Sequence, residues 1–104
     1  MINLKDAKKV HVEQLCNKNQ FVITYSCDGV VYWAFQSYYS LICVYCPSTK
    51  EILINKSKFD YSKTTSKHFK IFINEWTSYN YESKQQFMHD YLYKESELIT
   101  FFDD

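Results

Sequence analysis

The sequence predicts a single α+β domain over residues 1–104, in which a small antiparallel sheet of three to four strands packs against two C-terminal helices. Three observations predict this fold class. The chain of 104 residues has the common size of one domain. Its residues are 46% hydrophobic and 19% aromatic, which is enough to build a core. Its apolar residues alternate before Asp60 and recur at helical spacing after it.

The first strands are expected in the N-terminal half. Residues 9–16, "KVHVEQLC", alternate weakly and fit either an edge strand or a short helix, and the alternation favours the strand. In "FVITYSCDGVVYWAF", Asp28 and Gly29 separate two β-branched and aromatic runs, which predicts a hairpin with a type I′ turn. The expected partners are Cys27 with Val30, Tyr25 with Tyr32, Ile23 with Ala34, and Phe21 with Gln36.

A second hairpin follows. "SLICVYC" leads through the turn residues 47–50 to "EILIN", and both runs are rich in residues that favour strands. Both faces of the first hairpin are apolar, so we expect a helix to cover one face. The other face should be either covered as well or exposed as an apolar surface that binds other molecules.

The first helix is expected over residues 62–76. Thr65, Phe69, Phe72 and Trp76 recur every three or four residues and should form its apolar side, with both phenylalanines and the tryptophan mostly buried. The hydroxyl groups of residues 62–65 favour helix capping, because they can satisfy the free backbone amides of a first turn.

A last helix is expected over residues 83–102. Ser83 and Gln86 have the spacing of a capping box. Apolar residues then hold helical spacing to Phe102. Asp90, Glu97 and Asp104 recur every seven residues and would form an acidic stripe able to imitate a phosphate backbone.

Charge is distributed unevenly along a chain of zero net charge. Residues 1–70 hold ten lysines against five acidic residues, a net charge of +5, and residues 71–104 hold two lysines against seven acidic residues, a net charge of −5. Every basic residue is Lys, which disfavours sequence-specific DNA reading because Arg is the side chain that forks onto guanine. A single Gly and a single Pro disfavour a phosphate-cradling loop.

Three segments carry a family resemblance: "FQSYYSLIC", "EILIN" and "DYSKTTSKHFKIFI". With them the chain resembles a family of small uncharacterised phage proteins of low-GC Gram-positive bacteria, whose members share a Tyr-Ser-x-Thr-Thr-x-Lys-His helix start. The matching positions are Tyr61, Ser62, Thr64, Thr65, Lys67 and His68. The resemblance implies a phage origin, and small phage accessory proteins often bind and inhibit host machinery, including defence enzymes.

Metal binding and catalysis are both disfavoured, so we expect no cofactor and no enzyme. Cys43 and Cys46 have zinc-knuckle spacing, but residues three apart in a strand point to opposite faces. His68 lies near several hydroxyls, but no Cys is near it in sequence, and Asp60, which could orient its ring, more naturally caps the helix. The chain start lacks the apolar run of a secretory signal, and no stretch approaches the roughly 18 apolar residues of a membrane span. We therefore expect a protein of the host cytoplasm.

Two binding functions fit these patterns. The favoured one is a non-enzymatic inhibitor of a host protein, such as a nucleic-acid-targeting defence component of the anti-CRISPR kind. Aromatic anchors and acidic steering residues would lie at Tyr79, Tyr81, Glu82, Asp90, Tyr93, Glu95 and Glu97. The alternative is weak nucleic-acid binding by lysines interleaved with Phe59 and Tyr61, namely Lys56, Lys58, Lys63, Lys67 and Lys70. A solvated helix face would give the same lysine pattern.

Overall fold

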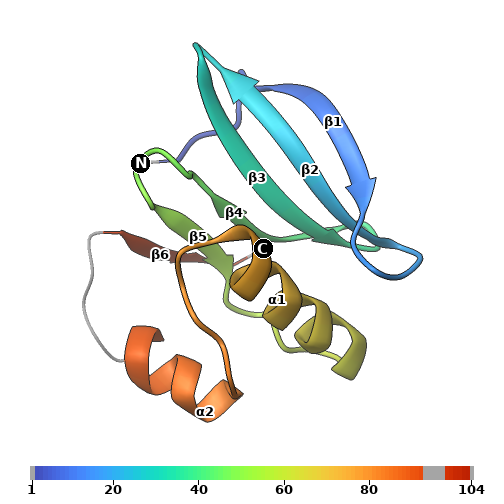
Figure 1. Cartoon of the computed structure of the whole chain (residues 1–104), viewed down its shortest axis with the longest axis vertical. Helices are drawn as coiled ribbons and strands as arrows, with labels where there is room; N and C mark the ends of the chain where they lie inside the picture. The colour runs from blue at the N-terminus through green and yellow to red at the C-terminus, as the bar shows by residue number, and fades with distance from the viewer. Residues whose placement is uncertain (1, 93–97, 104) are drawn as a thin grey trace.

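The computed structural model describes residues 2–92 and 98–103. Six strands form one mixed sheet whose spatial order follows the chain (Figure 1). They are β1 (Lys8–Gln14), β2 (Gln20–Cys27), β3 (Val30–Ser37), β4 (Ser40–Tyr45), β5 (Ile52–Asn55) and β6 (Ile99–Phe102). Strands β1 to β5 pair with one another antiparallel, whereas β6 runs parallel to β5.

Two helices connect β5 to β6. Helix α1 (Lys63–Trp76) lies against one face of the sheet (Figure 1), and the short α2 (Lys84–Phe87) continues as the π-helical η1 (Met88–Leu92). Within the described residues, neither helix has the length and apolar composition of a membrane-spanning helix.

The predicted sheet of three to four antiparallel strands is therefore wrong. The weakly alternating N-terminal segment is strand β1, and the chain end adds β6. The predicted helix over 83–102 is also wrong, because Ile99–Phe102 is a strand. The predicted acidic stripe needed one continuous helix over these residues, so it is wrong as well. Parallel pairing with β5 explains this outcome. The Ile52 N–H donates to the Leu98 carbonyl at 2.8 Å, and the Lys56 N–H donates to the Phe102 carbonyl at 2.8 Å.

The first predicted hairpin is confirmed pair by pair. Strands β2 and β3 pair Cys27 with Val30 and keep that register through Gln20 and Ser37. Asp28 and Gly29 have φ angles of 52° and 81°, the positive values that a type I′ turn requires. The turn therefore fixes which side chains of β2 and β3 face α1.

The core has two layers, one on each side of the sheet. On the helix side, α1 and α2 pack an aromatic cluster against the strands, and Phe69 and Phe72 are fully buried as predicted. Trp76 is only partly buried, although its ring lies 5.3 Å from the Trp33 ring. On the opposite side, Ile2 packs with residues such as Ile23 and Val44 in a smaller cluster. The N-terminal segment thus covers part of the second apolar face.

Replacing Phe72 by Ala should lower the free energy of unfolding by about 3–5 kcal/mol, because it removes a fully buried ring and leaves a cavity. Chemical denaturation measures the change. Tyr39→Ala is the matched control, because the Tyr39 side chain is 98% exposed and should contribute little to stability. Equal unfolding free energies for wild type and Phe72→Ala would show that α1 does not pack as described.

Candidate functional site

The start of α1 is held by a chain of three hydroxyl groups. The Ser62 Oγ accepts a hydrogen bond from the Thr65 N–H at 3.1 Å, which confirms the predicted cap. The Ser62 hydroxyl also donates to Thr65 Oγ1, which lies 2.9 Å from the Oγ of Ser37 at the end of β3. These hydroxyls therefore tie the first turn of α1 to the sheet.

His68 lies inside this packing. Its side chain is buried, and its Nδ1 lies 2.7 Å from the Thr64 carbonyl one helical turn earlier. Because a carbonyl only accepts hydrogen bonds, Nδ1 carries the proton and the ring is anchored to its own helix. This arrangement suits a structural histidine.

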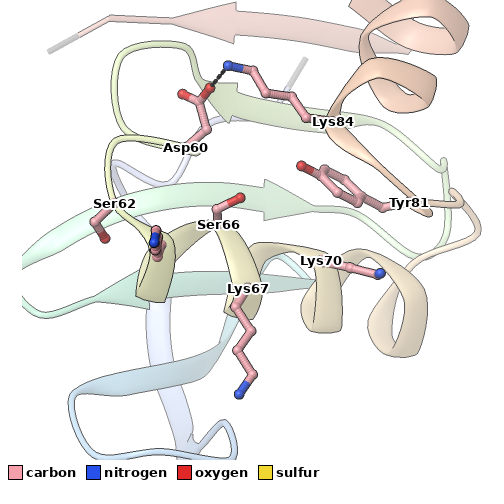
Figure 2. A pocket seen from close by; sticks show the side chains of 8 residues that line it. Asp60, Ser62, Ser66, Lys67, Lys70, Tyr81 and Lys84 are labelled. Atoms are coloured by element: carbon pink, nitrogen blue, oxygen red, sulfur yellow. Dashed lines mark ion pairs between the residues drawn. The ribbon is translucent and has the colours of Figure 1, made fainter.

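The outer side of α1 borders an open cavity of about 450 Å³ (Figure 2). Its lining combines four lysines with hydroxyl groups and one acid: Asp60, Ser62, Lys63, Ser66, Lys67, Lys70, Tyr81 and Lys84. Three of the five lysines predicted to contact nucleic acid therefore lie together here. Lys84 joins them from α2, and no local sequence signal connects it with them.

The four lysines differ in what already engages them. Lys84 reaches across the cavity to form an ion pair with Asp60 (Figure 2), and Lys70 Nζ donates to the Glu82 carbonyl at 3.1 Å. Lys63 and Lys67 are exposed, and no hydrogen bond or ion pair to either ammonium occurs within residues 2–92 and 98–103. Two ammonium groups at the start of α1 are thus available to an anion.

The charge order along α1 opposes the helix dipole. The positive end of the dipole lies at the N-terminus, where acidic side chains are stabilising and basic ones are not. The first turn of α1 contains no acidic residue and begins with Lys63, while Glu75 stands near the C-terminus. The helix dipole therefore gives Lys63 no stabilisation at this position.

An exposed aromatic ring lies beside Lys58, just before the start of α1. Tyr61, immediately before the cap, is 51% exposed, and Lys58 Nζ lies 5.6 Å from the centre of its ring. Phe59, in contrast, is buried and cannot stack on a ligand. We call the group formed by Lys58, Tyr61, Lys63, Lys67 and Lys70 the lysine–tyrosine site. Lys56 is exposed on the turn after β5 and does not line the cavity.

A second exposed aromatic feature adjoins the same helix end. Tyr38 and Tyr39 form the two-residue turn between β3 and β4, and they expose 47% and 98% of their surface. Tyr38 has a φ of 55° and its N–H donates to the Asn19 carbonyl at 2.7 Å. The neighbouring Ser37 is the residue that meets Thr65 of α1. We call residues 38–39 the tyrosine turn.

The predicted acidic partner site is poorly formed. Tyr81 is buried between Phe69 and Phe87, so little of its ring is exposed to a partner, and its role as an anchor stays a prediction. The partly buried Tyr79 donates its hydroxyl to the Lys50 carbonyl at 2.6 Å. Burial, followed by the nearby Tyr45 hydroxyl, raises the pKa of Tyr79 and keeps it a donor.

The acidic members of that predicted site are scattered or undescribed. Glu82 is exposed, whereas the Asp90 carboxylate accepts a hydrogen bond from Gln86 Nε2 at 2.8 Å. Tyr93, Glu95 and Glu97 lie outside the described residues.

The cysteines lie as the strand geometry predicts. Cys43 belongs to the helix-side cluster and Cys46 to the opposite one, so the two thiols face away from each other. Burial raises the pKa of Cys43 well above its usual value. Burial also opposes ionisation of Cys46, but hydrogen bonds from Ser48 and Thr49 outweigh it and lower that pKa. Within the part of the chain that the structure describes, no group of three or more His, Cys, Asp and Glu residues could hold a metal.

Comparison with known proteins places these features in a family. The model of a family of unknown function, DUF8033, matches residues 4–89. The chain belongs to the DUF8033 family. The matched region covers β1 to β5, α1, α2 and the cavity lysines, and it ends before β6. No curated protein and no solved structure matches the chain.

Replacing Lys63 by Glu should raise the free energy of unfolding by about 0.3–1 kcal/mol, because an acidic side chain in the first turn complements the helix dipole. Urea denaturation at low ionic strength measures the change. Lys56→Glu is the matched control, because Lys56 is an exposed lysine outside the helix. A loss of stability in Lys63→Glu would contradict the unfavourable interaction of Lys63 with the helix dipole.

Proposed function

We propose that this DUF8033 protein binds nucleic acid weakly through the lysine–tyrosine site, as a non-enzymatic accessory protein. The observation that carries the proposal is the open cavity along α1, which is lined by three helix lysines and Lys84. Phosphate oxygens are anions that lysines bind through charge. The two unengaged ammoniums, on Lys63 and Lys67, would make the first contacts.

Tyr61 provides the second part of the binding chemistry. An exposed aromatic ring next to cationic side chains supports stacking of an unpaired base while the lysines follow the backbone. The absence of Arg removes the usual side chain for reading guanine. Together these features favour single-stranded nucleic acid bound without strong sequence preference.

Changing Lys63, Lys67 and Lys70 together to Gln should abolish most binding to a labelled single-stranded oligonucleotide. Each phosphate contact contributes about 0.7 to the slope of log affinity against log salt, so the triple variant should reduce that slope by about 2. Fluorescence anisotropy over a salt series measures both quantities. The matched control changes Lys5, Lys8 and Lys9 to Gln, which removes the same charge from the N-terminal segment.

The control should bind like wild type. Equal affinities and equal salt slopes for wild type and the Lys63, Lys67 and Lys70 variant would show that α1 does not contact the phosphates.

A second candidate function is inhibition of a host protein by a phage-encoded protein acting in the host cytoplasm, as with an anti-CRISPR protein. The tyrosine turn favours it, because Tyr39 is 98% exposed and interface energy concentrates in a few large aromatic side chains. The sequence resemblance to small phage proteins supports it as well. The anchors would then be Tyr38 and Tyr39 in place of the buried Tyr81.

Affinity purification of the tagged protein from phage-infected cells, followed by mass spectrometry, should recover a host protein in stoichiometric amount. Tyr39→Ala should lose that partner, because truncating a central aromatic anchor typically costs about 2 kcal/mol or more. Val31→Ala is the control, since Val31 is an exposed residue of strand β3, outside the tyrosine turn. Recovery of no stoichiometric protein, together with tight oligonucleotide binding, would reject this second function.

A further inference from the structure

Strand β1 is an open edge of the sheet. It pairs only with β2, and all seven of its residues are exposed. Val10 and Val12 expose 59% and 47% of their surface, values unusual for strand valines. Figure 1 shows no described element beyond β1. Its outward N–H and C=O groups are therefore a template for a further strand.

The lysines and the bulge that usually block edge pairing are concentrated at the start of β1. Lys8 and Lys9 are charged, and the register with β2 shifts between Lys9 and His11, which marks a bulge. The shift leaves Val10 without a paired residue in β2, and residues 11–14 contain no Lys, no Pro and no further register shift. The second half of the edge is therefore open to pairing.

This open half is complementary to itself. Antiparallel pairing of two copies about a two-fold axis at Val12 places His11 opposite Glu13, Glu13 opposite His11, and Val12 opposite Val12. Paired residues must lie on the same face of a sheet. His11 and Glu13 both do, because they pair with Thr24 and Val22 of β2. Within one chain, His11 Nε2 already lies 3.5 Å from the Glu13 carboxylate.

Neighbouring registers are less favourable. An axis at Glu13 would set two carboxylates against each other. An axis at His11 would pair Lys9 with Glu13, but the bulge puts these side chains on opposite faces, since Lys9 pairs with Tyr25 and Glu13 with Val22. The charges of the facing residues, and the face of the sheet on which each residue lies, therefore favour a two-fold axis at Val12.

We propose that β1 pairs with β1 of a second copy about this axis, which joins the two sheets into one. An axis perpendicular to the sheet keeps both α1 helices on the same face, so a dimer would present two lysine–tyrosine sites on one side. Pairing of residues 10–14 alone buries less than the roughly 1,200–2,000 Å² of stable interfaces, so association should be weak and depend on concentration. The inference does not depend on nucleic-acid binding.

Sedimentation of the full chain from micromolar to millimolar concentration should show a reversible monomer–dimer equilibrium. Val12→Lys should weaken association about tenfold or more, because it places two ammonium groups opposite each other. Val31→Lys is the matched control, an exposed valine of strand β3 away from β1, and should dimerise like wild type. A monomer at every concentration, or unchanged dimerisation of Val12→Lys, would overturn the proposal.

A charge exchange tests the register. Glu13→Lys should weaken association, whereas the double variant His11→Glu with Glu13→Lys should restore it, because the new carboxylate at position 11 then faces the new ammonium group at position 13 about Val12. Both side chains are exposed, at 62% and 46%, so the fold should not be disturbed. Far-ultraviolet circular dichroism checks this. A double variant that dimerises no better than Glu13→Lys would overturn the pairing of His11 with Glu13.

Discussion

The contact between Phe72 of α1 and Phe35 of β3 is the interaction on which the rest of the structure depends. Their rings lie 5.9 Å apart and nearly parallel, at an angle of 21°, and both side chains are fully buried. Trp76 stacks on Phe72 one turn later, and the Ser37–Thr65 hydrogen bond holds the other end of the helix. Because these contacts fix the rotation of α1, they also determine which of its residues face solvent.

The lysine–tyrosine site follows from that rotation. Lys63, Lys67 and Lys70 lie on the side of α1 that borders the open cavity, away from the buried phenylalanines. The same packing brings the tyrosine turn against the first turn of the helix, through Ser37. Two exposed features of different chemistry, one cationic and one aromatic, therefore share one end of the molecule. Nucleic acid would use the first, and a protein partner would use the second.

Local signals made about half of this architecture predictable. Asp28 and Gly29 fix the β2–β3 register because a two-residue turn leaves no alternative, and Ser62 marks the start of α1. The strand at the chain end was not predictable, because the apolar residues near Phe102 fit the spacing of a helix as well as the alternation of a strand. Parallel pairing with β5 makes this segment a strand, and that pairing cannot be seen in the local sequence. Lys84 escaped prediction for a similar reason: its ion pair with Asp60 joins residues far apart in sequence.

The central claim is that the rotation of α1 creates a binding surface for nucleic acid. The most direct measurement is a titration of isotope-labelled protein with a single-stranded oligonucleotide, followed by amide chemical shifts. The largest shifts should fall on residues 58–70, while residues 8–14 and the core strands should change little. Shifts confined to residues 79–92, or no shift at any concentration of oligonucleotide, would contradict the account.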